Sequence, residues 1–434
     1  MRDYTDTYKK RTPKSGALHQ RALAILPGGI NHNIRFYPPY PIYVQRAQGP
    51  RIWDVDGNEY IDLWMVHLSA ILGHAHPAVI EALEEQAPNA LHYGLVHERM
   101  LDLGELVCEM VPCAEMVRFC GSGTEATHYA ARLARAYTGK RVIAKVEGGW
   151  HGGNDVLQVA WTYPYDRPLS GVIPDAQRYT VVIPFNDLEG TESVLAKHQE
   201  DLAAVIIEPV LGAGGCIPAD REYLLRLGEI TERYGSLLIF DEVITGFRFP
   251  HCAQGLYDIK PDLTTLGKTL GGGLPIGAIC GRGEIMELAT PSKGTFIGGG
   301  TFSGNVSTMT TGIATLTYLK EHPSLYERIA LAGDTLRRGI DGVFTDHGIR
   351  AQTTGTGSML ATHFPLEDIE VKSNRDAAER CDPAKTSEYN IRLINHGVFF
   401  IPGHGGAISG VHGEREMQQI LHAAEIVATE MSEG

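Results

Sequence analysis

The chain has 434 residues and a formal net charge of −14, with 43% hydrophobic and 21% charged residues. This composition is typical of a folded globular protein with a large core, and the acidic balance argues against nucleic-acid binding, which needs a basic face. A chain of this length exceeds one comfortable core, so we expect two domains, or one large domain with a lobe built from both termini. Small molecules are the expected partners.

The cysteine pattern and the hydropathy indicate the compartment. The seven cysteines are odd in number and scattered, and no C-x-x-C pair occurs, so we expect reduced thiols. The start of the chain lacks the pattern of a signal peptide, and no stretch reaches the roughly 20 apolar residues of a membrane span. We therefore predict a cytoplasmic protein without a membrane segment.

Residues 1–60 begin with a polar, helix-like stretch and are expected to form the N-terminal part of a small lobe. Strand signals at 51–54 and 59–63 flank Asp56-Gly57. Such a dipeptide between two short strands is typical of a β-hairpin.

Residues 61–320 are expected to form the large domain. Apolar, strand-like segments alternate there with helical periods, which predicts an α/β fold: a mostly parallel central sheet flanked by helices. Ligands bind such sheets outside the carboxyl ends of the strands. Residues 321–434 return to helices and short strands and are expected to complete the small lobe, giving a small α+β lobe from both termini. The strand-like segments of the large domain are 116–120, 142–146, 203–207, 237–240 and 278–280.

Two residues suggest a specific chemistry. Lys268 stands in the glycine-rich segment LGKTLGGGLP, and Asp241 ends the apolar run SLLIF. Pyridoxal phosphate needs a lysine to hold its aldehyde and an acid to keep its pyridine nitrogen protonated. Taken singly, Lys268 could be a solvated loop lysine and Asp241 a helix cap or a surface ion-pair partner. Together they are far more specific.

A phosphate site is indicated where a strand ending at Cys120 runs into GSGTEA and a helix. The hydroxyls of Ser122 and Thr124 and the free backbone N–H groups at a helix N-terminus suit an anion. A capping box between Ser122 and Glu125 is the competing interpretation, and both can hold at once. Thr301, in GGGTFSGN, offers another hydroxyl to a phosphate or forms a plain turn.

Two further motifs contain aromatic or imidazole rings. Trp150, in GGWHGG, could stack on a flat ring or be a core tryptophan. His74 and His76, in GHAHP, superficially suggest a metal pair, but no further ligands accompany them at the usual spacing. No metal is expected.

These motifs occur together in one order along the chain: GSGTEA, EGGWHGG, IIEP, FDEVITGFR, TLGKTLGGGLPIGA and GTFSGN. In this the chain resembles the class III, fold-type I aminotransferases that depend on pyridoxal 5'-phosphate. The resemblance runs from about residue 20 to residue 425. It is greatest to the branch that contains glutamate-1-semialdehyde aminomutase, the β-phenylalanine aminotransferases and the D-phenylglycine aminotransferase.

The resemblance implies roles for individual residues. Lys268 would form the Schiff base with the cofactor and then move the proton, and Asp241 would bind the pyridinium nitrogen. Val243 would pack behind the ring and Trp150 on its other face. The resemblance also implies that Ser122, Gly123 and Thr124 hold the phosphate with Thr301 of a partner subunit, that His151 and Glu208 belong to the cofactor site, and that Arg35 lies near the substrate carboxylate.

The function implied is an aminotransferase that moves an amino group from an amino acid, β- and D-amino acids included, or from an amine, to a keto acid by a ping-pong mechanism. The alternative is glutamate-1-semialdehyde 2,1-aminomutase or an amino-acid racemase on the same scaffold. The loop 401–410 lacks the acid that aminomutases carry there, and the segment 161–167 is aromatic where theirs is rich in small residues, which favours transfer. A non-catalytic protein of this fold is disfavoured by Lys268 and Asp241.

A homodimer with shared active sites is implied as well. The residues that we expect to line the substrate pocket are Arg35, His67, Trp161, Tyr163 and His404.

Overall fold

The computed structural model describes residues 4–167 and 169–433, which divide into two compact units. Unit 1 combines Met1–His76, Glu327–Val371 and Asp376–Gly434, and unit 2 combines Pro77–Tyr326 with Lys372–Arg375. The domain boundaries expected after residues 60 and 320 fall instead after His76 and Tyr326. The first moves because β3 (Glu59–Asp62) pairs with β2 (Arg51–Asp54), so the chain beyond residue 60 still belongs to unit 1.

Unit 2 is built on a seven-stranded sheet whose strand order is β4-β12-β11-β10-β7-β5-β6. Neighbouring strands run parallel except where β12 pairs with β11 and β4. The segment between β11 and β12 is shorter than the dozen or so residues that a parallel crossover needs, so the chain returns antiparallel. The strands are β4 (Met116–Cys120), β5 (Val142–Val146), β6 (Thr180–Ile183), β7 (Leu202–Ile207), β10 (Leu237–Glu242), β11 (Leu263–Gly267) and β12 (Gly277–Gly281).

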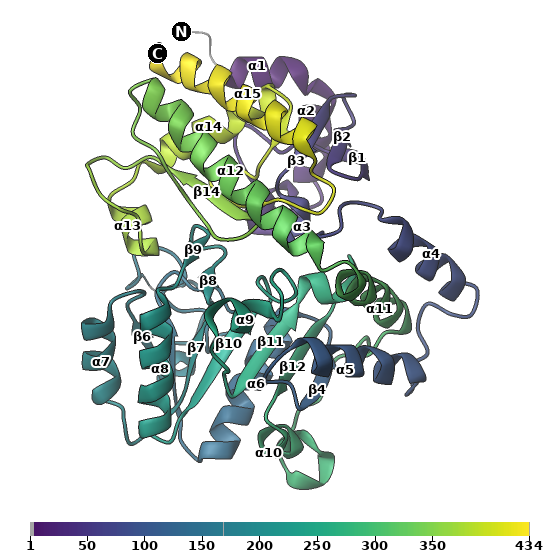
Figure 1. Ribbon diagram of the computed structural model, residues 1–434, viewed down its shortest axis with the longest axis vertical. Helices are drawn as coiled ribbons and strands as arrows, with labels where there is room; N and C mark the ends of the chain where they lie inside the picture. The colour runs from purple at the N-terminus through teal and green to yellow at the C-terminus, as the bar shows by residue number, and fades with distance from the viewer. Residues whose placement is uncertain (1–3, 168, 434) are drawn as a thin grey trace. The chain divides into compact units, whose positions relative to one another are not determined.

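Helices cover both faces of this sheet. The helix α6 (Gly123–Thr138) packs on β12, β11 and β7, while α7 (Leu188–Ala196) and α8 (Arg221–Arg233) lie side by side on the other face (Figure 1). The strands β5, β7 and β10 are buried throughout, as expected of strands covered on both faces. The remaining elements of unit 2 are α4 (Pro77–Gln86), α5 (Glu98–Met110), η3 (Pro174–Gln177), β8 (Val210–Leu211), β9 (Ile217–Pro218), α9 (Cys252–Tyr257), η4 (Lys268–Gly271), α10 (Gly283–Met286), η5 (Glu287–Ala289), η6 (Pro291–Lys293) and α11 (Val306–Glu321).

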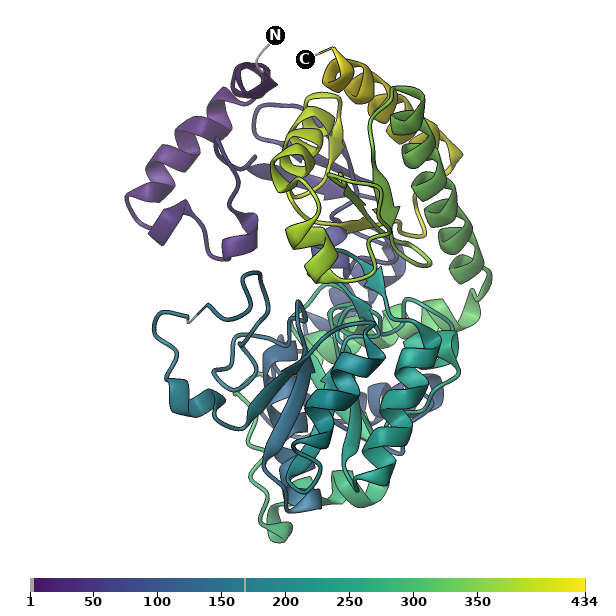
Figure 2. The same cartoon turned by 90° about the vertical axis from the view of Figure 1, so that its left-hand side faces the viewer.

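Unit 1 holds a four-stranded sheet, β1-β2-β3-β15, and a three-stranded sheet, β13-β14-β16. Figure 2 shows α12 (Ser324–Asp346) and α15 (Glu414–Ser432) running side by side, and α1 (Tyr4–Arg11) packs against α14 (Pro383–Asn395), so both termini contribute to this unit. Its other elements are α2 (Pro13–Leu23), η1 (Pro27–Gly29), η2 (Asn33–Arg35), β1 (Val44–Gln48), α3 (Met65–Leu68), β13 (Gln352–Thr354), β14 (Met359–His363), β15 (Val398–Phe399) and β16 (Gly406–Ala407). The helix α13 (Asn374–Glu379) begins with two residues of unit 2 and continues in unit 1.

The expected α/β fold with a mostly parallel, helix-flanked sheet is confirmed. Among residues 4–167 and 169–433, no helix combines the length and apolar content that crossing a bilayer requires.

Candidate active site

The predicted cofactor residues of unit 2 follow the carboxyl ends of its parallel strands, which all open at one edge of the sheet. Ser122 follows β4, Trp150 follows β5, Glu208 follows β7 and Lys268 follows β11, while Asp241 lies near the end of β10. This edge is where α/β sheets bind their ligands.

Asp241 is a buried carboxylate held by three donors. It accepts hydrogen bonds from His151 Nδ1 at 2.7 Å, from Thr265 Oγ1 at 2.9 Å and from the Val243 N–H at 3.1 Å. Only 3% of the residue is exposed. The network fixes the orientation of the carboxyl group, and a carboxylate buried in this way needs a cationic or donor partner.

His151 is as buried as its partner, and its ring has a second nitrogen to satisfy. Burial lowers the pKa of His151, and the Asp241 carboxylate only partly opposes this effect. Its Nε2 is buried and makes no hydrogen bond within the described residues. Orphaned buried polar atoms of this kind mark places where a ligand or water completes the structure.

The Trp150 loop is held from two sides. Glu208 accepts the Trp150 N–H at 2.8 Å and the Gly212 N–H at 3.0 Å. Lys145, buried within β5, donates to the carbonyl of Gly149 at 2.8 Å and to that of Val159 at 2.6 Å. Burial raises the pKa of Glu208 to about 7 and lowers that of Lys145 to about 7, so both groups sit in a low-dielectric interior.

Lys268 stands at the end of β11 with a left-handed backbone, φ 47°. Strained positions of this kind cluster at functional sites. Burial lowers the pKa of Lys268 to about 8, although the carboxylates of Glu208 and Asp241 pull it upward; Arg248 nearby lowers it further. The lysine therefore has far more free amine at neutral pH than an exposed lysine.

The N-terminus of α6 is capped as the sequence predicts, while its role as a phosphate site stays a prediction. Ser122 caps the helix by accepting the Glu125 N–H at 3.3 Å, and Glu125 accepts the Gly121 N–H at 2.6 Å. The N–H groups of the first helical turn have no intrahelical acceptor, so those of Gly123 and Thr124 stay available to an anion.

Glycines allow the segments around this helix end to approach closely. A Cβ on Gly277 would lie 2.0 Å from the Ser122 carbonyl oxygen, and one on Gly123 would lie 3.0 Å from the Val243 side chain. Val243 therefore packs directly against the start of α6.

Thr301 lies beside this helix end. A cavity of about 650 Å³ is lined by Ser122, Glu125 and Thr301, among others. The Thr301 carbonyl accepts a hydrogen bond from His92 Nε2 at 2.9 Å. Its contribution to a partner's phosphate site stays a prediction.

The residues predicted for substrate binding are spread over both units. Trp161 contacts Trp150, with ring centroids 5.1 Å apart, and Tyr163 lies next to Tyr165 in the same loop. Arg35 belongs to unit 1, where it is exposed at the end of η2, so its role stays a prediction.

In unit 1, the rings of His67 and His404 both contact Trp64, at 4.5 and 6.2 Å between centroids. His74 pairs with a carboxylate of the same unit: its Nε2 lies 2.7 Å from Asp62 Oδ2.

Several residues of the site were missed by sequence reasoning. Lys145 was detectable, because a lysine inside a buried apolar strand is unusual. Thr265 gave no comparable signal.

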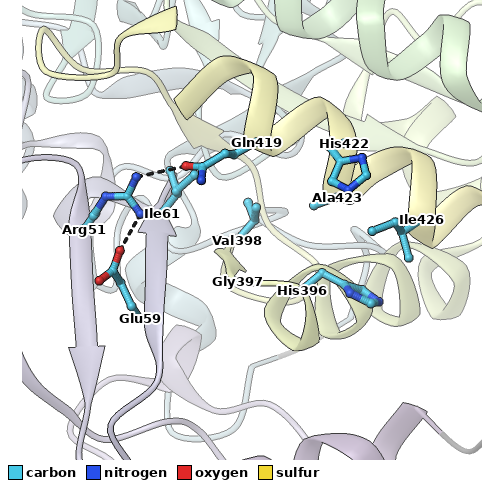
Figure 3. Close-up of a pocket in the computed structure, with 10 residues that line it drawn as sticks. All are labelled: Arg51, Glu59, Ile61, His396, Gly397, Val398, Gln419, His422, Ala423 and Ile426. Atoms are coloured by element: carbon cyan, nitrogen blue, oxygen red, sulfur yellow. Dashed lines mark hydrogen bonds and ion pairs between the residues drawn. The ribbon is translucent and has the colours of Figure 1, made fainter. Parts of the chain in front are cut away.

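A second cavity, of about 270 Å³, lies in unit 1 between β2, β3, the end of α14 and α15 (Figure 3). Its one guanidinium, from Arg51, bonds Glu59 at 2.6 Å, Glu416 at 2.9 Å and Gln419 at 3.0 Å. These partners already compensate the positive charge of Arg51, so the described residues that line the cavity leave no free cation to bind an anionic ligand.

Comparison with known proteins assigns the class. The model of the family "Aminotransferase class-III" matches residues 35–409. The chain belongs to this family, and its fold is that of the fold-type I enzymes that depend on pyridoxal phosphate.

Particular relatives are named for two activities. Glutamate-1-semialdehyde 2,1-aminomutase of Methanothermobacter thermautotrophicus is 41% identical over 422 residues, which cover 95% of this chain and 98% of that protein. An omega-transaminase from Sphaerobacter thermophilus superposes with a TM-score of 0.89 at 34% identity, covering 97% of this chain and 98% of the other. A transaminase solved with PLP bound also superposes with a TM-score of 0.89, at 32% identity, covering 97% of this chain and 98% of the other.

Proposed function

We propose that this chain uses pyridoxal 5'-phosphate to move an amino group within one small amino-carbonyl substrate, as a glutamate-1-semialdehyde 2,1-aminomutase does. The observation that supports it most is the placement of Lys268, half-buried, and Asp241, buried, at the same sheet edge, in a chain 41% identical to an enzyme of that name over 95% of its length.

The cofactor of the family is pyridoxal phosphate, and the residues present fit it. Asp241 is a buried acid suited to the ring nitrogen, His151 Nε2 is a buried atom still in need of a partner, and the first turn of α6 offers free N–H groups to the phosphate. Bound there, the cofactor supplies an aldehyde that condenses with amines and a protonated ring that withdraws electrons from the amine-bearing carbon.

The chain's own residues would then divide the work. Asp241, oriented by His151 and Thr265, would hold the proton on the ring nitrogen. Lys268, whose pKa burial lowers to about 8, would accept a proton at Nζ from the amine-bearing carbon and return it at a neighbouring position. The Trp150 loop, held by Glu208, would cover one face of the ring and exclude water from it.

Transfer of the amino group between two substrates is the second candidate. It was the function preferred from the sequence, and the named curated relative favours the isomerase instead. Two observations support it: the solved structures named transaminases are 34% and 32% identical, and the loop 401–410 carries no acid.

The need for an acceptor separates these candidates. Purified holoenzyme is given glutamate-1-semialdehyde alone, and the isomer with the amino group on carbon 1 is measured over many turnovers. We expect catalytic turnover without any keto acid. A panel of amino acids that each exhaust the enzyme after one turnover, with recovery on adding a keto acid, would establish the transaminase instead.

We further propose that two copies of the chain assemble around the cavity that contains Thr301. The residues Leu95, Val96 and Phe302 expose large apolar side chains, by 77%, 88% and 66%. His92 and His97 bond the carbonyls of Thr301 and Gly304, which fixes this apolar segment beside the cavity. Exposed apolar surface of this extent is typical of an interface.

The compartment is also a proposal. All seven cysteines are free, six of them buried, which fits a reducing environment. A cytoplasmic location therefore stays a prediction from the cysteine pattern.

A further inference from the structure

The segment Lys372–Arg375 comes from the C-terminal part of the chain, yet it belongs to unit 2. Arg375 binds Glu147 through two hydrogen bonds, Nε to Oε1 at 3.0 Å and Nη2 to Oε2 at 2.6 Å. The Glu147 side chain is 6% exposed and directly precedes the GGWHGG loop. A bidentate pair of this geometry fixes direction as well as distance.

Asn374 adds contacts to the turn between β8 and β9 and to a later part of the connection that follows β5. Its Nδ2 donates to the Gly214 carbonyl at 2.9 Å, and its Oδ1 accepts the Tyr165 hydroxyl at 2.6 Å. The Arg375 guanidinium lies 5.0 Å from the centre of the Tyr165 ring.

The Asn374 side chain also packs directly over Gly148. The φ of Gly148 is +74°, and a Cβ there would lie 2.3 Å from Asn374 Cβ, so only glycine fits beneath this side chain. The two residues thus join three segments: the turn that follows β5, the later part of the same β5–β6 connection that contains Tyr165, and the turn between β8 and β9 that contains Gly214.

We propose that Asn374 and Arg375 are positioning residues that hold the Glu147–Trp150 turn, and through it Trp150 and His151, in the geometry that binds the cofactor. The proposal rests on the cofactor role proposed for Trp150 and His151. Arg375 is half-exposed, and exposed ion pairs add little to global stability. Its bidentate contact with a buried carboxylate therefore points to a local, orienting role.

The test compares Arg375→Ala and Asn374→Ala with the wild type in binding of pyridoxal phosphate to the apoprotein and in quenching of Trp150 fluorescence. Trp150→Phe assigns the signal. We expect about tenfold weaker cofactor binding and reduced quenching, with an unchanged melting temperature of the apoprotein. Arg375→Lys, which keeps the charge and loses the fork, should recover only part of the affinity.

Arg141→Ala is the matched control. Arg141 pairs with Asp201 at the opposite end of β5 and should leave both readouts unchanged. Should Arg375→Ala fail to fold, Tyr165→Phe removes a single hydroxyl of the same network and should still reduce quenching.

Wild-type affinity and quenching in the folded variants would overturn the proposal. Neither readout needs an amino substrate. A wild type that binds the cofactor but converts no substrate would contradict the proposed reaction and leave this inference standing.

Discussion

Asp241 shows how a single side chain is prepared for the cofactor. Its carboxylate is fixed by His151, Thr265 and its own strand before any ligand arrives. Such preorganisation matters because groups already in place pay no reorganisation cost during the reaction.

Asp241→Asn tests this role directly. The amide keeps the size but cannot hold a proton on the ring nitrogen by charge, so we expect turnover to fall about 10²–10³-fold. The half-reaction rate of the holoenzyme measures it. Asp258→Asn, at an exposed side chain in the same unit, is the control, and a near-normal rate for Asp241→Asn would show that the carboxylate is structural.

Lys268 makes a second prediction, on pH. Because the free amine is the reactive form and burial lowers the pKa of Lys268 to about 8, cofactor capture by the apoenzyme should accelerate as pH rises and level off above about 8. Stopped-flow absorbance from about pH 6 to about pH 10 measures the rate of cofactor capture across the range in which this lysine titrates. A rate still climbing steeply near the ordinary lysine pKa would contradict the assignment.

At this scale the sequence points to candidate residues where the chemistry is local. Lys268, Asp241 and Ser122 are recognisable because each stands in a short motif. Arg375 could not be found in this way, because its partner Glu147 lies 228 residues away and only the fold brings them together.

The strand β10 is the element on which the site depends, and it carries two adjacent carboxylates. Alternation along a strand sends Glu242 to the face opposite Asp241. There Glu242 accepts hydrogen bonds from Thr245 Oγ1, the Ala253 N–H and Gln254 Nε2. These bonds hold the segment between β10 and α9 against the end of β10.

Glu242 therefore links pH to stability. Burial raises its pKa to about 7 in the folded protein, above its value in the unfolded chain. The protonated group contributes stability that is fully present below the unfolded pKa and is lost as pH rises through about 7. Between about pH 5 and about pH 8, the free energy of unfolding measured in urea should fall less for Glu242→Gln than for the wild type, because the amide does not titrate. Glu229→Gln on α8 is the exposed control, and parallel curves for wild type and Glu242→Gln would refute the idea.

Elements were predictable where burial leaves continuous apolar runs. Strands β5, β7 and β10 were expected within a few residues of their bounds. The strands β6 and β11 were not expected, since both are short and contain threonine, and the antiparallel direction of β12 follows from a connection whose length the sequence did not reveal.

On the scale of the whole molecule, both termini build unit 1, as expected, but its boundaries follow strand pairing and not composition. The sequence indicates the β2–β3 hairpin, but the bridge between Gly49 and His74 joins residues that no local pattern connects, and it ties the chain near His76 to unit 1.

The proposed dimer makes a prediction at the same scale. Val96→Asp places a charge on the exposed apolar segment, so we expect the holoenzyme to dissociate and to lose cofactor. Light scattering measures the mass. Leu256→Asp, at an exposed apolar residue of α9, should remain at twice the mass of one chain. A wild type that is already monomeric would contradict the assembly.

The central claim is that Lys268 is the amine that holds pyridoxal phosphate. The measurement that tests it most directly is borohydride reduction of the holoenzyme, which fixes the cofactor on the lysine that carries it, followed by peptide mass mapping. We expect the label on Lys268 in the wild type and its loss in Lys268→Ala, with Lys260→Ala, at an exposed lysine, labelled as the wild type is. A label on Lys145 or another lysine, or a fully labelled Lys268→Ala protein, would contradict the account.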